Sequence, residues 1–200
     1  MNQELLDNNY LFVPEFITKQ EAASLYREFK KDIQLYPNFF PTKDANTFGS
    51  PTAINYVSFV ALLCEKTAYM NQLVEEKLLP TYAYARVYKN GAELTKHTDR
   101  PSCEVSVTLH IGSDGTSWPI CFTKPNGSVV SKDLKPGEAV IYLGCISEHW
   151  RESTFVGQEY GQVFLHYVRS NSENWNHCFD IPHQLESLFN QRMQQFYKQN

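Results

Sequence analysis

Hydrophobic positions divide the chain into a helical first part and a β-rich second part. Residues 10–17 form a short apolar run, after which Thr18 and Glu21 have the spacing of a capping box, so a helix should begin there. Apolar residues then recur at intervals of three and four, which predicts a helix with one buried face: Ala22, Leu25, Tyr26, Phe29 and Ile33. Residues 36–55 mix Pro, Gly, Asn and aromatic residues, which predicts a structured loop that could form one wall of a pocket.

A second helix is expected from Val57 to Leu79, ended by Pro80. Its candidate core positions are Val60, Leu63, Cys64, Ala68, Leu73 and Leu78. Short β-rich segments separated by glycine turns follow, and the expected strands are 82–89, 94–97, 104–111, 118–123, 128–133, 137–143 and 161–169. Residues 182–198 have the apolar spacing of a closing amphipathic helix.

This order predicts an α+β, mainly β fold: a double-stranded β-helix, which is a cupin-like jelly roll of about eight strands, with N-terminal helices and a C-terminal helix around it. A chain of 200 residues that is 42% hydrophobic can form one core. We therefore expect a single domain over 1–200, with helical support in 1–80, the β core in 82–170 and the closing helix in 182–198.

Charge and composition remove some partners. The net charge is −4 and no basic run is longer than Lys30-Lys31, so the footprint of a nucleic-acid binder is missing. No segment has the pattern of a signal peptide or of a membrane span. Single, unpaired spacing of Cys64, Cys103, Cys121, Cys145 and Cys178 predicts reduced, mostly buried thiols. Together these features predict a cytoplasmic protein without nucleic-acid or membrane partners.

Candidate metal ligands stand at two places in the β-rich part. Residues two apart in extended chain point to the same side, so His97 and Asp99 can bind one ion together. His149, fifty residues after Asp99, can add a third ligand from a strand that folds back alongside. Two imidazoles and one carboxylate on one face are the set that non-haem Fe(II) uses for oxygen chemistry. The alternative is that these residues bind no metal: His97 and Asp99 would form a hydrogen-bonded pair at the surface, and His149 would be a half-buried histidine.

The surroundings of these residues resemble a known family. The run from Arg86 through Tyr88, Gly91 and His97 to Asp99, and the run from Leu134 to Tyr142 before His149, resemble those of prolyl 4-hydroxylase-like 2-oxoglutarate oxygenases. Residues 11–21 also look like that family's entry strand and first helix. The resemblance implies an Fe(II)- and 2-oxoglutarate-dependent dioxygenase that uses O2, converts 2-oxoglutarate to succinate and CO2, and hydroxylates a small-molecule or peptide substrate. Peptidyl proline is one candidate substrate.

The resemblance fails at one position. Relatives usually carry an Arg or Lys nine or ten residues after the distal histidine, where it holds the far carboxylate of 2-oxoglutarate, but here Gln158 and Glu159 follow. Tyr88 matches a tyrosine that binds the co-substrate in relatives, and Arg86, Arg151 or Arg169 could supply the positive charge. The predicted co-substrate contacts are Tyr88, Thr108, His110, Arg151, Gln162, His166 and Arg169, with a pocket of Tyr88, Thr108 and His110 completed by Arg169 or Arg151. Arg100 is expected to face the substrate.

Three other functions fit parts of the pattern. A nucleic-acid demethylase with the same centre is disfavoured by the acidic charge. A cupin-like metal protein without 2-oxoglutarate chemistry would not need the run around Tyr88. The third alternative is a non-catalytic protein that has the same sheets and uses them to bind a ligand. The oligomeric state does not follow from the sequence.

Overall fold

The computed structural model describes residues 1–42, 49–181 and 183. Its described strands are β1 (Tyr10–Val13), β2 (Thr52–Ile54), β3 (Leu78–Lys89), β4 (Val105–Ser113), β5 (Ile120–Thr123), β6 (Val129–Lys132), β7 (Ala139–Tyr142), β8 (His149–Trp150) and β9 (Glu159–Arg169). Within the described residues they form two antiparallel sheets, a large one in the order β1-β7-β4-β9-β3-β2 and a small one in the order β6-β5-β8.

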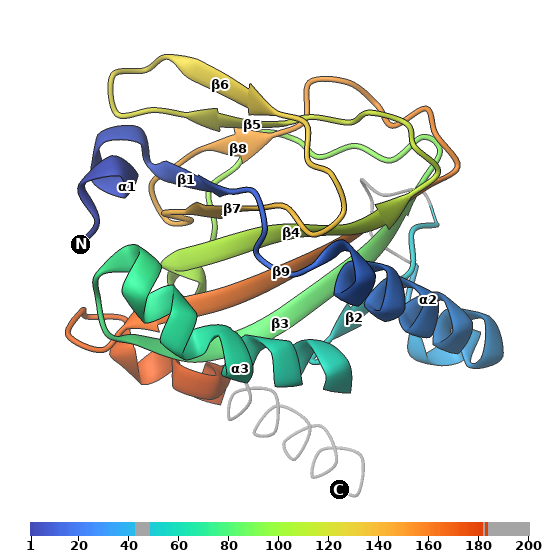
Figure 1. Cartoon of the computed structure of the whole chain (residues 1–200), viewed down its shortest axis with the longest axis horizontal. Helices are drawn as coiled ribbons and strands as arrows, with labels where there is room; N and C mark the ends of the chain where they lie inside the picture. The colour runs from blue at the N-terminus through green and yellow to red at the C-terminus, as the bar shows by residue number, and fades with distance from the viewer. Residues whose placement is uncertain (43–48, 182, 184–200) are drawn as a thin grey trace, which may run out of the picture.

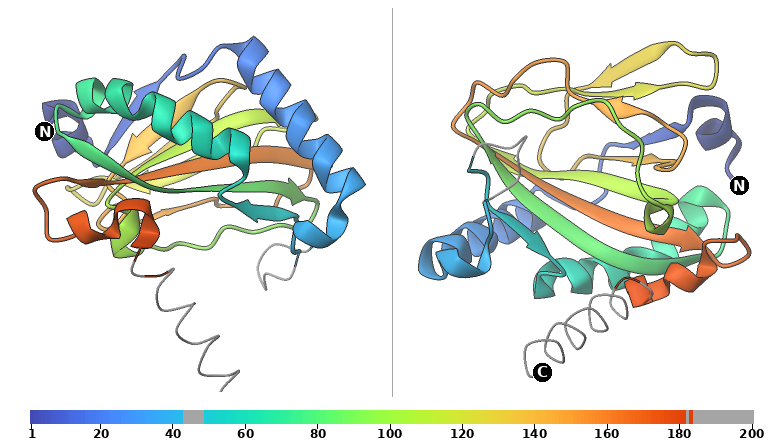
Figure 2. Two further views of the ribbon diagram at one scale, coloured as in Figure 1. Left: turned by 90° about the horizontal axis from the view of Figure 1, so that it is seen from below. Right: turned by 180° about the vertical axis from the view of Figure 1, so that it is seen from behind.

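The long helices α2 and α3 lie on one side of the large sheet, and the small sheet lies on the other (Figure 1). The α-helices are α1 (Gln3–Asn8), α2 (Lys19–Leu35) and α3 (Val57–Val74), and the 3-10 helices are η1 (Pro37–Phe39), η2 (Pro101–Cys103) and η3 (Trp175–Asp180). Figure 2 shows α2 and α3 crossing the same face of the large sheet. The predicted capping box at Thr18 and Glu21 is confirmed, with both of its hydrogen bonds present.

Strand alternation gives the large sheet two different faces. One face packs against the helices and is apolar, with Val107, Leu109, Val163 and Leu165 all completely buried in the main core. Intervening residues turn toward the small sheet; they include the buried polar Thr108, and also Val140 and Tyr142, which pack with Ile120 and Phe122 in a smaller apolar cluster. The main core therefore lies on the helical side, whereas the other side combines a smaller apolar cluster with buried polar groups.

Several expected elements differ from the structure. α3 ends at Val74, followed by Glu75 in a left-handed conformation, so the expected helix to Leu79 is wrong in its last turn. Cys64 and Ala68 are exposed, because the buried face of α3 instead carries residues such as Phe59 and Met70.

The expected strand 94–97 is loop in the structure, with a single bridge between His97 and His149. β2 lies within the expected loop 36–55. The expected helix 182–198 falls outside the described residues except for His183.

All five cysteines are free, and only Cys103 and Cys121 are buried, so the expectation of mostly buried thiols is wrong. The prediction that Cys64 is buried is wrong because its side of α3 faces solvent. No helix in the described ranges combines the length and apolar character that a membrane crossing requires.

Candidate metal centre and its cavity

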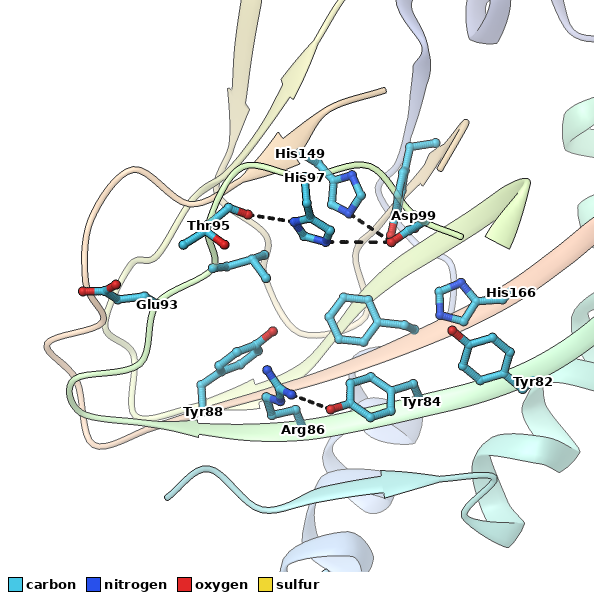
Figure 3. Close-up of a pocket in the computed structure, with 13 residues that line it drawn as sticks. Tyr82, Tyr84, Arg86, Tyr88, Glu93, Thr95, His97, Asp99, His149 and His166 are labelled. Atoms are coloured by element: carbon cyan, nitrogen blue, oxygen red, sulfur yellow. Dashed lines mark hydrogen bonds and ion pairs between the residues drawn. The ribbon is translucent and has the colours of Figure 1, made fainter. Parts of the chain in front are cut away.

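His97, Asp99 and His149 meet at the edge of the small sheet. The backbones of His97 and His149 exchange two hydrogen bonds, of 3.2 and 2.9 Å, and the Asp99 amide donates to the Gly144 carbonyl at 2.8 Å. These pairings bring Asp99 Oδ1 to 3.8 Å from His97 Nε2 and 3.6 Å from His149 Nε2 (Figure 3). Local backbone pairing, without the strand expected at 94–97, therefore assembles the three side chains.

The hydrogen bonds of the two imidazoles assign their tautomers. His97 Nδ1 lies 2.7 Å from the Thr95 carbonyl, and His149 Nδ1 lies 3.0 Å from the Ser147 carbonyl. A carbonyl only accepts, so both rings donate from Nδ1, and the neutral form of each ring has its lone pair on Nε2. Two nitrogen lone pairs and a carboxylate oxygen thus converge without a proton between them, which is an arrangement that a cation stabilises.

Burial sets the protonation of this cluster. His149 is 3% exposed, and burial lowers its pKa, so it stays in the neutral form that binds metals. Burial also raises the pKa of Asp99, and charges on His149 and His97 oppose that rise. His97 is the most exposed of the three, at 39% of its side chain. Two imidazoles and one carboxylate are a donor set that suits a divalent metal of the Fe(II) type.

Gly144 holds the backbone close to Asp99 and was not identified from the sequence. A Cβ added there would lie 2.2 Å from the Cys103 carbonyl oxygen and 2.7 Å from Asp99 Oδ2. The carbonyl cannot move without its helix, so a side chain at 144 would displace the carboxylate. A single glycine in a loop gives no sequence signal for this role.

A cavity of about 420 Å³ opens beside the three residues. Its floor is the inner face of β3, from which Tyr82, Tyr84, Arg86 and Tyr88 point toward these three candidate ligands (Figure 3). Arg86 is 6% exposed, donates to the Tyr84 hydroxyl, and has its guanidinium 5.3 Å from the ring centroids of Tyr84 and Tyr88. The sequence pattern placed Arg86 and Tyr88 on one face, as observed.

A second buried polar group lies between the sheets and does not line this cavity. Gln162 donates to the Thr108 hydroxyl, and His110 donates from Nδ1 to the Gly161 carbonyl at 3.0 Å. Burial lowers the pKa of His110 to about 4. Thr108, His110 and Gln162 are therefore neighbours, as strand alternation predicted.

Arg151 lies in the same region. It is 5% exposed, and its guanidinium is 4.3 Å from the Trp118 ring centroid and 4.7 Å from that of Tyr160. Nη2 is 3.5 Å from Gln162 Oε1, whereas Nε and Nη1 have no hydrogen-bond partner among the residues that the structure describes. A buried cation in this state favours an anion nearby.

Other charged candidates are engaged elsewhere. Arg169 pairs with Glu104 at 2.7 Å and does not line the cavity. Glu159 interacts with Lys30, Lys89 and Tyr26, on the helical side of the sheet. Glu159 stands where relatives carry the Arg or Lys that holds 2-oxoglutarate, and its contacts turn it away from the cavity.

Arg100 and His166 lie at the other end of the cavity. Arg100 forms a bidentate ion pair with Asp180, with both nitrogen–oxygen distances at 2.9 Å, and its guanidinium stacks over the Tyr82 ring. His166 lines the cavity beside Tyr82, with ring centroids 4.4 Å apart. Arg100 itself does not line the cavity, and it contacts Tyr82, which does.

Solved structures resemble this one over most of its length. A prolyl-4-hydroxylase from Pseudomonas putida has a TM-score of 0.66 and 14% identity, with 83% of this chain and 95% of that chain covered. HygX from Streptomyces hygroscopicus, with nickel and 2-oxoglutarate bound, has a TM-score of 0.66 and 10% identity, with 86% and 88% covered. The epimerase SnoN, in complex with Fe3+, alpha-ketoglutarate and nogalamycin RO, has a TM-score of 0.69 and 9% identity, with 83% and 81% covered.

No family model and no curated protein matches the sequence. The structural likeness establishes the class of fold. This chain has the jelly-roll fold that 2-oxoglutarate- and Fe(II)-dependent oxygenases share, with a mixture of helices and antiparallel sheets.

Proposed function

We propose that the protein is an Fe(II)- and 2-oxoglutarate-dependent dioxygenase that hydroxylates a C–H bond of a substrate. The observation that carries this proposal is the convergence of His97 Nε2, His149 Nε2 and Asp99 Oδ1 at the edge of a cavity. The fold supports it, because the metal- and co-substrate-bound neighbours have the same architecture.

His97, Asp99 and His149 would hold the iron. When bound, Fe(II) and 2-oxoglutarate supply the oxidising chemistry, in which O2 converts 2-oxoglutarate to succinate and CO2 while a substrate C–H bond is hydroxylated. The protein holds the ligands in position: the Thr95 and Ser147 carbonyls fix the two imidazole tautomers. The small exposed fraction of His149 keeps water from that side of the centre.

The far carboxylate of 2-oxoglutarate needs a buried cation, and Arg151 is our proposed anchor. It lies two residues after His149, on the same side of the chain, and two of its nitrogens lack hydrogen-bond partners in the described part of the structure. Gln162 and Thr108 lie beside it and could complete the contacts, together with His110. Tyr88 packs edge-on against Trp118, 4.9 Å between centroids, and so borders both this region and the cavity.

The primary substrate would enter the cavity beside His97. Tyr82, Tyr84 and Tyr88 give this cavity an aromatic wall with hydroxyl groups, and Glu93 and Thr95 lie on its other side (Figure 3). This lining suits a small molecule or a peptide side chain, including peptidyl proline.

Anaerobic spectroscopy tests the proposal directly. Addition of Fe(II) and then 2-oxoglutarate to the metal-free protein should produce the weak visible charge-transfer band of the chelate. His97→Ala, Asp99→Asn and His149→Ala should each abolish the band, whereas His177→Ala, a histidine on η3, should retain it. Absence of the band in the unaltered protein, together with absence of uncoupled succinate formation, would exclude the proposed function and favour a cupin-like or non-catalytic protein.

A further inference from the structure

Three potential metal ligands meet on the other side of Asp99. One ligand atom from each of Asp99, Cys103 and His166 lies within 4.8 Å of the other two. Cys103 is 2% exposed and His166 is 4% exposed. Cys103 belongs to η2 and His166 to β9, so the cluster depends on a contact between elements that are distant in the sequence.

Ser106 contacts the side chains of Asp99 and His166 and the backbone of Cys103. Its hydroxyl oxygen is 3.1 Å from the Cys103 carbonyl oxygen and 3.4 Å from Asp99 Oδ2. It is also 2.8 Å from His166 Nδ1. The carbonyl and the carboxylate only accept, so they take the hydroxyl proton and His166 donates from Nδ1 to the hydroxyl oxygen. His166 Nε2 therefore carries a lone pair that can bind a metal.

Asp99 can serve both sides because its two oxygens have different neighbours. Oδ1 faces the imidazoles of His97 and His149, whereas Oδ2 lies near Ser106. Tyr82, whose hydroxyl is 3.1 Å from Cys103 Sγ, lines the cavity together with Asp99 and His166 (Figure 3). An ion can thus reach the cluster from the cavity.

The Cys103 thiol distinguishes this cluster chemically from the cluster of His97, Asp99 and His149. Sulfur, imidazole nitrogen and carboxylate oxygen are the ligands that Zn2+ takes in proteins, and thiolate sulfur selects softer cations. The cluster of His97, Asp99 and His149 offers no sulfur. We infer that Asp99, Cys103 and His166 form a second metal site, selective for Zn2+ and similar thiophilic divalent cations, which shares its carboxylate with the first.

Sharing Asp99 makes the two sites antagonistic. A Zn2+ ion bound to Cys103 and His166 draws on the carboxylate that the first site needs, so each metal weakens the other by the same factor. Inhibition of catalysis by Zn2+ follows from this coupling and rests on the proposed function, whereas Zn2+ binding itself does not. The thiol must release its proton when the metal binds.

Cobalt titration tests the second site without any assay of activity. Co2+ added anaerobically to the metal-free protein should give an intense near-ultraviolet thiolate-to-cobalt band, and Zn2+ should bleach it. Cys103→Ser should remove the band. Cys121→Ser is the matched control, since Cys121 is also 2% exposed but lies on β5, and it should retain the band.

His149→Ala separates this inference from the proposed function. It breaks the first site and leaves all three residues of the second intact, so the cobalt–thiolate band should persist while the iron chelate band is lost. Asp99→Asn should remove both. Circular dichroism and thermal melting establish that each variant is folded, and His166→Gln replaces Cys103→Ser if the latter does not fold. A wild-type protein without a thiolate band, or a band that survives Cys103→Ser or His166→Gln, overturns the second site whatever the iron result.

Discussion

Replacement of Arg151 by methionine should weaken 2-oxoglutarate binding strongly while barely changing the stability of the metal-free protein. Arg151 has two nitrogens, Nε and Nη1, without hydrogen-bond partners among the described residues. Hydrogen bonds to charged groups contribute roughly 1.5–3 kcal/mol each, so two such bonds to a carboxylate contribute at least about 3 kcal/mol. At about 1.4 kcal/mol per factor of ten, the Kd for 2-oxoglutarate should rise about 100-fold or more.

Two opposing contributions determine the free energy of unfolding of the metal-free Arg151→Met variant. Arg151→Met loses the guanidinium contacts with Trp118 and Tyr160, at about 0.5–2 kcal/mol each. It also removes two buried N–H groups whose missing hydrogen bonds cost about 1–3 kcal/mol each. These terms nearly cancel, so the free energy of unfolding should change by no more than about 1 kcal/mol, which corresponds to a Tm shift of about 2–4 °C.

Arg169→Met is the matched control, and the two variants should differ in their affinity for 2-oxoglutarate. Its guanidinium pairs with Glu104 at 2.7 Å, and the arginine side chain is 36% exposed. Solvent screening limits the loss of stability to about 1 kcal/mol, and 2-oxoglutarate affinity should not change. Anaerobic titration of the Fe(II) protein, followed by the visible chelate band, measures the affinity, and urea unfolding measures the stability. An unchanged Kd in Arg151→Met would refute the assignment of this residue as the anchor.

Two further changes probe the metal centre and the buried histidines. Gly144→Ala should displace the Asp99 carboxylate, because the added Cβ would lie 2.2 Å from the Cys103 carbonyl oxygen and 2.7 Å from Asp99 Oδ2. It should reduce Fe(II) affinity at least about tenfold and destabilise the fold by about 1–3 kcal/mol, and unaltered iron titration would contradict this role. Burial lowers the pKa of His110 from 6.5 to about 4, so the unfolded chain takes up a proton between these values and the native state does not. Stability should therefore fall with decreasing pH across this window, and His110→Gln should reduce the slope by about 1.4 kcal/mol per pH unit, as measured by urea unfolding of the metal-free proteins at several pH values.

The grouping of His97, Asp99 and His149 could be predicted from the sequence because it depends on short-range geometry. Two residues on the same side of an extended segment remain neighbours whether or not the segment joins a sheet. The expected strand 94–97 is absent, yet the backbone pairing of His97 with His149 still brings the third ligand to the pair. The order of elements around these residues was sufficient to predict the class of fold.

Alternation along single strands was also predictable. Gln162, Phe164 and His166 share the face toward the small sheet, and Arg169 lies on the other face, where it pairs with Glu104. The helix predictions were weaker, since the αL residue Glu75 ends α3 before Pro80 does. Glutamate has no strong preference for this conformation, so the sequence gives little signal for the end of the helix.

Contacts between the two sheets, by contrast, depend on how closely short segments approach, and no periodicity encodes that distance. Arg151 follows a strand of two residues, and its neighbours come from two other segments: Trp118 from the stretch before β5, and Tyr160 and Gln162 from β9. The cluster of Asp99, Cys103 and His166 likewise requires η2 to turn the thiol toward β9. Asp99 would present one oxygen to each proposed metal site, so its position affects both, and Gly144 and Ser106 lie against its carboxylate. Two small residues therefore position the carboxylate on which both proposed sites depend, although neither Gly144 nor Ser106 resembles a metal ligand in the sequence.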